Sequence, residues 1–225
     1  MPYRLQREIE RLKKSILTLG AVVEERVHMA VRAIEDRDGK LARRVIDGDI
    51  EIDEMEVDLE EECLKLLVLH QPVAIDLRFI IAVLKINSDL ERIGDLAVNI
   101  GERAVFVATQ KRIDIPFDFP TMSKKVKEML KKSLDSLVNM DVSLARKICE
   151  MDDEVDAIHR EMYDQVKKGI REHPDRLDCL IHLLGVSRHL ERIADSATNI
   201  AEDVIYMTEG KIVRHRAEEY GEDKG

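Results

Sequence analysis

Apolar residues recur at intervals of three and four near the start of the chain, at positions 5, 9, 12, 16, 19, 23, 27 and 30. This spacing places them on one face of a helix, so we expect a long amphipathic helix from about Leu5 to Asp36. The same reasoning predicts helices at about 41–70, 73–109, 122–140, 142–171 and 175–208. Breaks fall at Asp38-Gly39, Gln71-Pro72 and His173-Pro174, because glycine and the residue before proline disfavour helical geometry.

The chain contains an internal repeat. Residues 90–102, LERIGDLAVNIGE, return at 190–202 as LERIADSATNIAE, and nine of the thirteen positions are identical. Residues 49–53, DIEID, correspond in the same way to 152–156, DDEVD. Such self-similarity indicates a duplicated structural unit. We therefore predict an all-α fold of two tandem, pseudo-symmetric three-helix bundles, six helices in all, with a first repeat at 1–113, a connector at 114–120, a second repeat at 121–210 and a polar tail at 211–225.

Small residues form a stripe along the repeated helix. Gly94, Ala97 and Gly101 share one face in the first copy, and alanines occupy the equivalent positions 194, 197 and 201 in the second. Glycine inside a helix costs about 1 kcal/mol relative to alanine. Two glycines at this spacing therefore predict that a neighbouring helix packs at close range.

Composition narrows the functional classes. The net charge of −10 argues against a nucleic-acid-binding protein, whose binding surface is usually basic. Cys63, Cys149 and Cys179 lack the spacing of a disulfide framework or a zinc site, so we expect buried, reduced thiols. The longest apolar run, 79–84, is far shorter than the ~20 residues that span a bilayer. We predict a cytoplasmic protein that meets a membrane only through protein partners.

Carboxylates recur at a spacing of four on the second and third helix of each predicted bundle. The pairs are Asp49/Asp53, Glu91/Asp95, Asp152/Asp156 and Glu191/Asp195. Like charges at this spacing destabilise a helix by a few tenths of a kcal/mol, yet the pattern occurs in both copies. If the helices bring two pairs together, each bundle gains an oxygen-rich site suited to Mg²⁺, Mn²⁺ or Fe³⁺. The alternative is that these acids lie on solvated helix faces.

Two histidine motifs raise a second metal hypothesis. Glu25-Arg26-Val27-His28 and Asp156-Ala157-Ile158-His159 resemble the Glu-x-x-His pairs of ferritin-like di-iron proteins. They fall on helices that are not equivalent under the repeat, which weighs against this reading. We expect the remaining histidines, 70, 173, 182, 189 and 215, on the surface or in turns. The sequence shows no nucleophile paired with a base, so we predict a protein that is not an enzyme.

The run DLERIGDLAVNI at 89–100, its second copy at 189–200 and QPVAIDLR at 71–78 resemble the phosphate-uptake regulator family, PhoU. The resemblance extends from about residue 5 to 208. It implies two three-helix bundles, a homodimer, and negative regulation of phosphate uptake and phosphate-starvation signalling. Implied partners are the ATPase subunit of a phosphate ABC transporter and a sensor histidine kinase. The resemblance also implies multinuclear metal binding, with iron, manganese or magnesium, at the four carboxylate pairs.

Two alternatives to this regulatory function stay open from the sequence. One is a carboxylate-bridged protein that stores metal or uses it in redox chemistry. The other is a plain helical scaffold in which the repeated acids bind nothing.

The second repeat also departs from the first, since His189 stands where the first copy has Asp89, which puts equal occupancy of the two metal sites in doubt.

Overall fold

The computed structural model describes residues 2–111 and 118–210 of the chain, and these ranges contain helices and no strand. The α-helices are α1 (Pro2–Glu35), α2 (Gly39–Asp47), α3 (Asp49–His70), α4 (Ala74–Thr109), α5 (Phe119–Asn139), α6 (Val142–Glu172) and α7 (Leu177–Glu209). A 3₁₀ turn, η1 (Pro174–Arg176), precedes α7. The predicted all-α fold of two tandem three-helix bundles is confirmed.

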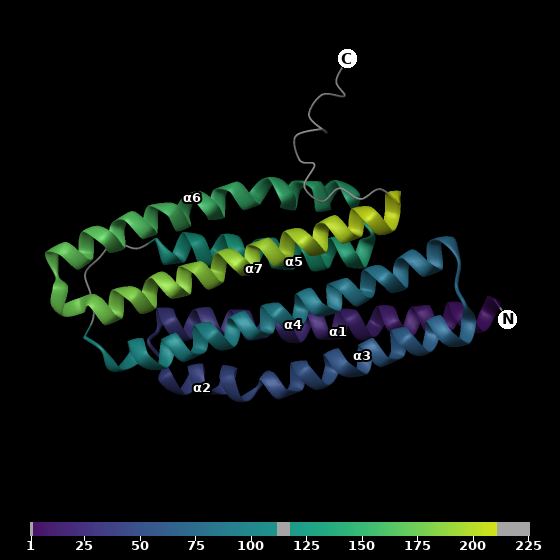
Figure 1. Cartoon of the computed structure of the whole chain (residues 1–225), viewed down its shortest axis with the longest axis horizontal. Coiled ribbons are helices and arrows are strands. Elements are labelled where there is room, and N and C mark those ends of the chain that lie inside the picture. Colours follow the sequence, from purple (N-terminus) through teal and green to yellow (C-terminus); the bar gives the residue numbers. More distant parts are fainter. Residues whose placement is uncertain (1, 112–117, 211–225) are drawn as a thin grey trace, which may run out of the picture.

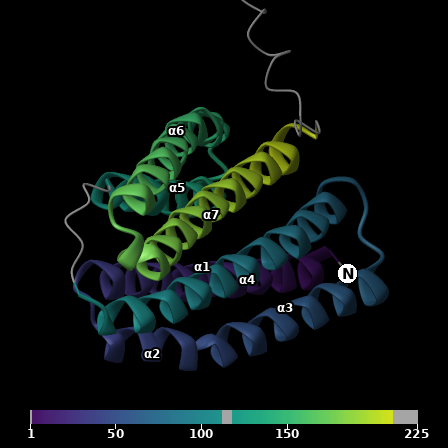
Figure 2. The ribbon, with the colours of Figure 1, turned by 60° about the vertical axis from the view of Figure 1, so that its left-hand side comes forward.

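The two bundles share one hydrophobic core. One bundle contains α1, the α2–α3 pair and α4, and the other contains α5, α6 and α7 (Figures 1 and 2). They meet where α4 packs against α7 and α1 against α5. Figure 1 shows that α4 and α7 run antiparallel, with the α3–α4 and α6–α7 connections at opposite ends of the molecule. The buried apolar residues of both halves form one continuous cluster.

The second predicted helix, 41–70, is interrupted at Gly48, which separates α2 from α3. Gly48 leaves space for a side chain of α1, Arg26. Its guanidinium lies where a Cβ on residue 48 would be, and its Nη2 pairs with Glu51 Oε2 at 2.6 Å. The prediction of one unbroken helix was wrong here, since glycine is a weak helix former and residue 48 separates α2 from α3. At the other end of α2, Asp38 Oδ1 accepts hydrogen bonds from the amides of Lys40 and Leu41.

The glycines of α4 mark a close helix approach, as predicted. A Cβ on Gly101 would lie 3.2 Å from the Ala42 carbonyl oxygen of α2. A Cβ on Gly94 would lie 3.0 Å from Ile52 Cδ1 of α3. Both glycines are buried. The stripe therefore holds the α2–α3 pair tightly against α4.

Some expectations fall on the boundaries of the described ranges. Of the expected connector, residues 114–117 lie outside the described residues, whereas Phe119 and Pro120 form the first turn of α5, capped by Asp118. The expected polar tail also lies outside them.

Among the helices described, none carries an apolar stretch long enough to cross a bilayer. The three cysteines are free, and burial raises the pKa of Cys63 to about 12.

The Gly101→Val variant should be less stable than the parent protein by about 1–3 kcal/mol, the usual cost of overpacking a filled core. The added side chain would meet the backbone of α2, which cannot rotate away as a side chain can. Urea denaturation followed by circular dichroism measures the difference. Glu102→Val, the same new side chain at the exposed neighbouring position, should change stability by no more than about 0.5 kcal/mol. Equal stability of the two variants would contradict the close approach.

Candidate metal centres

The first acidic cluster consists of Asp49 and Asp53 on α3 with Glu91 and Asp95 on α4. The close packing at Gly94 brings these helices together, and a Cβ on Gly94 would lie 3.8 Å from Asp49 Oδ1. Burial, with the charges of Asp53 and Asp95, raises the pKa of Asp49, although Arg26 opposes this. Burial also raises the pKa of Glu91, helped by the carboxylates of Asp95, Glu56, Asp53 and Asp49. The predicted acids therefore share one electrostatic environment.

The second acidic cluster consists of Asp152 and Asp156 on α6 with Glu191 and Asp195 on α7. Burial, followed by the charges of Asp195, Asp156 and Glu191, raises the pKa of Asp152 to about 6. The pKa values of Glu191 and Asp195 are raised too, first by burial and then by neighbouring carboxylates. Asp152 Oδ1 is buried and has no hydrogen-bond partner among the described residues. A buried carboxylate oxygen without a donor is the kind of atom that a cation satisfies.

The donor set of both clusters fits a hard cation, because all eight predicted side chains are carboxylates. In residues 2–111 and 118–210, however, no three candidate ligands already converge on a single ion position. The helices bring the acids of α3 and α4, and those of α6 and α7, into mutual repulsion, but the side chains do not form a closed coordination shell. Metal binding by these residues therefore stays a prediction.

Basic side chains next to the clusters were not singled out from the sequence. Arg26 of α1 pairs with Glu51, and Lys125 of α5 pairs with Glu154. Glu51 and Glu154 each lie between the two aspartates of a cluster helix and are equivalent under the repeat. That equivalence was the available signal. In each bundle, a basic side chain of the first helix thus forms an ion pair with an acid beside the cluster. That basic side chain forms no ion pair with the predicted ligands among the described residues.

Glu56 was also missed. It lies on α3 and contributes to the raised pKa of Glu91, and burial, Glu60 and Asp53 raise its own pKa. Its position one helical turn beyond Asp53 was the signal. Its equivalent in the second bundle is His159, so the two clusters differ at this edge.

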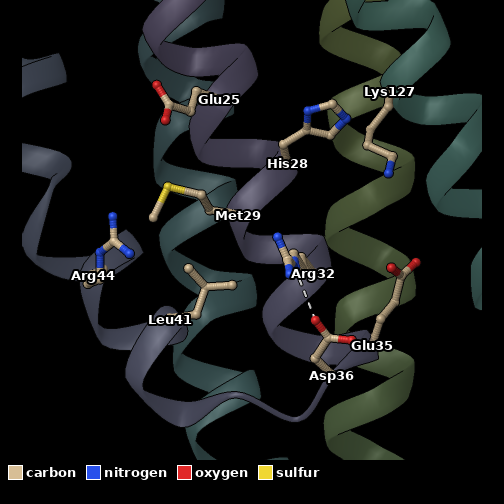
Figure 3. Close-up of a pocket in the computed structure, with 9 residues that line it drawn as sticks. All are labelled: Glu25, His28, Met29, Arg32, Glu35, Asp36, Leu41, Arg44 and Lys127. Atoms are coloured by element: carbon tan, nitrogen blue, oxygen red, sulfur yellow. Dashed lines mark hydrogen bonds and ion pairs between the residues drawn. The ribbon is translucent and has the colours of Figure 1, made fainter.

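The two ferritin-like motifs do not meet at one site. Glu25 and His28 line a groove with Lys127 (Figure 3), whereas His159 lies in a different groove and hydrogen-bonds through Nδ1 to the Ser187 hydroxyl. The placement gives the di-iron reading no support.

The expectation that the other histidines are surface or turn residues was wrong for His189. It is 9% exposed, and burial, with nearby arginines, lowers its pKa to about 4. His182 is half-buried and stacks on Phe106, with ring centroids 3.9 Å apart. Both residues lie on α7, and the close packing of α4 against that helix was not visible in the local sequence.

Comparison with known proteins adds a family assignment to this geometry. A family model described as PhoU domain matches residues 16–104 and again 119–204. The chain is 40% identical to the phosphate-specific transport system accessory protein PhoU homolog of Aquifex aeolicus, over 95% of this chain and 96% of that protein. It is 34% identical to the homolog of the same name from Clostridium acetobutylicum, over 92% and 94%. The crystal structure of PhoU from Pseudomonas aeruginosa matches with a TM-score of 0.88 and 33% identity, covering 92% of this chain and 99% of that one.

The Asp152→Asn variant should be more stable than the parent protein in metal-free buffer at pH 8, by about 1 kcal/mol after allowance for partial exposure. The folded-state pKa of Asp152, about 6, lies above the ordinary value of 3.8. The charged carboxylate therefore destabilises the fold above about pH 6, and this penalty fades as pH falls toward 3.8. Most of the gain should be lost at pH 4.

Urea denaturation at pH 8 and pH 4, after dialysis against EDTA, measures the difference. Asp164→Asn, on an exposed position of the same helix, is the control and should change stability by no more than about 0.5 kcal/mol at either pH. A loss of stability in Asp152→Asn at pH 8 would show that the carboxylate is favourably paired instead.

Proposed function

Because this chain belongs to the PhoU family, we propose that it is a cytoplasmic, non-catalytic accessory protein of a phosphate-specific transport system. The observation that carries the proposal is the match of the family model to both repeats, at 16–104 and 119–204. Relatives named as accessory proteins of this transport system align with more than nine-tenths of the chain. A similar fold is found in the phosphate transport system regulatory protein PhoU from Streptococcus pneumoniae, with a TM-score of 0.83 and 29% identity.

The finer part of the proposal is negative regulation by contact. The protein binds the ATPase subunit of a phosphate ABC transporter and a sensor histidine kinase, acts as a homodimer, and keeps uptake and phosphate-starvation signalling low when phosphate is plentiful. A regulator of this kind shifts its partners only if it binds one of their states more tightly than the other.

An exposed apolar patch supports a function through protein contact. Around the α3–α4 turn, four apolar side chains are 68–75% exposed: Val68 and Leu69 at the end of α3, Val73 in the turn and Ile75 at the start of α4. Exposed apolar side chains gathered in this way are typical of protein–protein interaction sites.

Metal binding at the two acidic clusters is the second part of the proposal. Asp49, Asp53, Glu91 and Asp95 would hold ions in the first bundle, and Asp152, Asp156, Glu191 and Asp195 in the second. Bound cations would offset the carboxylate repulsion in each cluster and give Asp152 Oδ1 a partner. Hard oxygen donors suit iron, manganese and magnesium alike.

Protein purified without a histidine tag should retain iron, manganese or magnesium after gel filtration, as measured by elemental analysis. Replacing the α4 and α7 ligands together, as Glu91→Gln/Asp95→Asn/Glu191→Gln/Asp195→Asn, should remove that metal. The control replaces exposed acids at similar spacing elsewhere, as Glu54→Gln/Asp58→Asn/Glu161→Gln/Asp164→Asn, and should keep it. Equal metal content in both variants would mean that the clusters are not the binding sites.

Deleting the gene should leave the phosphate-starvation genes switched on in phosphate-rich medium, and the intact chain supplied in trans should restore repression. Transcript levels of those genes in rich and poor phosphate measure the effect. Continued repression in the deletion strain would contradict the regulatory proposal. Repression restored equally by the cluster variant and by the intact chain would separate regulation from metal binding.

A further inference from the structure

A second groove, distinct from the acidic clusters, has a strongly basic lining. It lies between α4, α6 and α7 and has a volume of about 570 Å³, within the range of small-molecule sites. The residues that define this cationic groove are Arg103, His159, Tyr163, Arg188, His189 and Arg192. Among the described residues, no carboxylate lines it. Such a surface is unusual in a chain with a net charge of −10.

The duplication supplies an internal comparison. The equivalent groove of the first repeat is lined by Leu84, Lys85, Ser88, Asp89, Arg92 and Asn199. Its charges are satisfied within the protein, because Asn199 Nδ2 donates to Asp89 Oδ1 at 3.2 Å and Lys85 Nζ pairs with Asp203 Oδ1 at 3.3 Å. Its mixed charges give it no preference for an anion.

Four differences between the repeats separate this neutralised groove from the cationic one, and three of them lie on the helix that carries most of the lining. Ser88 becomes Arg188, Asp89 becomes His189, and Lys85 becomes Gly185. The fourth change is on the facing helix, where Arg103 of α4 occupies the position equivalent to Asp203 of α7. The Arg103 guanidinium lies where a Cβ on residue 185 would be, so glycine gives it this position. The cationic groove therefore lacks an acid at two positions, one on α4 and one on α7, where the other groove has one.

Several polar atoms of the cationic groove lack hydrogen-bond partners within the described chain. Both ring nitrogens of His189 and Nε of Arg103 are buried without a hydrogen-bond partner among the described residues. Within the same residues, Arg103, Arg188 and Arg192 form no ion pair within 4.0 Å. Arg188 and Arg192 act on Glu191 only at longer range. Since buried polar groups in folded proteins nearly always have partners, a ligand that accepts hydrogen bonds would complete this site.

The groove in Figure 3 shows the contrast. It also contains arginines, but three acids line it too, namely Glu25, Glu35 and Asp36. Arg32 Nε pairs with Asp36 Oδ2 at 3.1 Å. Glu35 there accepts a hydrogen bond from the Ser123 hydroxyl. Of the three grooves compared, which are formed by described residues, the cationic groove alone has arginines and no lining carboxylate.

We propose that the cationic groove binds a small phosphorylated organic anion. Arginine presents a planar set of donors that matches phosphoryl oxygens, and three arginines from two helices surround the groove. Tyr163 and Ile181 are about half exposed at its edge and offer an apolar surface to the organic part of the ligand. A nucleotide has both parts. This proposal goes beyond the regulatory function and does not depend on metal binding.

Isothermal titration calorimetry on the full chain, freed of metal with EDTA and studied at low salt, tests the site with ADP, orthophosphate and adenosine. ADP is expected to bind at one site per chain, orthophosphate at least about tenfold more weakly, and adenosine without saturation. Arg188→Ser, which installs the first-repeat residue at an exposed position, should weaken ADP binding roughly tenfold or more, the loss expected for a charge-assisted hydrogen bond.

Arg43→Ser is the control, because it removes the same charge from an exposed position on α2; ADP should bind this variant as it binds the parent. Circular dichroism confirms that both variants are folded. The proposal is overturned if ADP shows no saturable binding, or if Arg43→Ser weakens binding as much as Arg188→Ser, which would indicate diffuse charge attraction. Orthophosphate binding as tight as ADP would overturn the organic part of the ligand assignment.

Discussion

Close packing of the third helix of each bundle against the second is the constraint on which both acidic clusters depend. In the first bundle, Gly94 and Gly101 leave no space between α4 and the α2–α3 pair. In the second, the stripe is made of buried alanines, among them Ala194 and Ala201. This packing fixes the rotation of α4 and α7, and so places their acids against those of α3 and α6. The position of the carboxylates is therefore set by the packing of the small residues and not by the carboxylates themselves.

Burial of apolar side chains in the core offsets the unfavourable free energy of bringing these acids together. In both clusters, burial and neighbouring carboxylates raise the pKa of acids such as Asp49, Glu91 and Asp152, so their charged forms reduce the stability of the fold. Fully buried side chains such as Ile52 and Ile93 lie on the same helices, and each contributes about 1.5–3 kcal/mol when buried. A few such residues outweigh the repulsion of one cluster. The fold therefore tolerates an acidic site that its charges alone would disfavour.

The sequence could predict the features that recur in both copies and those that depend on residues close together in the chain. Apolar spacing located the helices, the duplicated LERI segments gave the two bundles, and the acid pairs shared by both copies gave the clusters. What it could not predict depends on side chains from distant helices. The Arg26 side chain of α1 lies against Gly48, where α2 ends, and the pairing of Lys125 with Glu154 joins α5 to α6. His189 looked exposed because its burial arises where α4 packs against α7, which no single helix reveals.

The antiparallel crossing of α4 and α7 explains why the two repeats diverge where they do. Around this crossing, residues near the start of one helix face residues near the end of the other, as Lys85 faces Asp203 and Gly185 faces Arg103. A duplicated pair of helices thus makes each groove from both copies, and a change in one copy alters one groove without the other. The acidic clusters lie within single bundles and keep their acids, since each depends on its own small-residue packing. The shared crossing is free of that requirement, so it is the place where a duplicated fold can acquire a second, different binding chemistry.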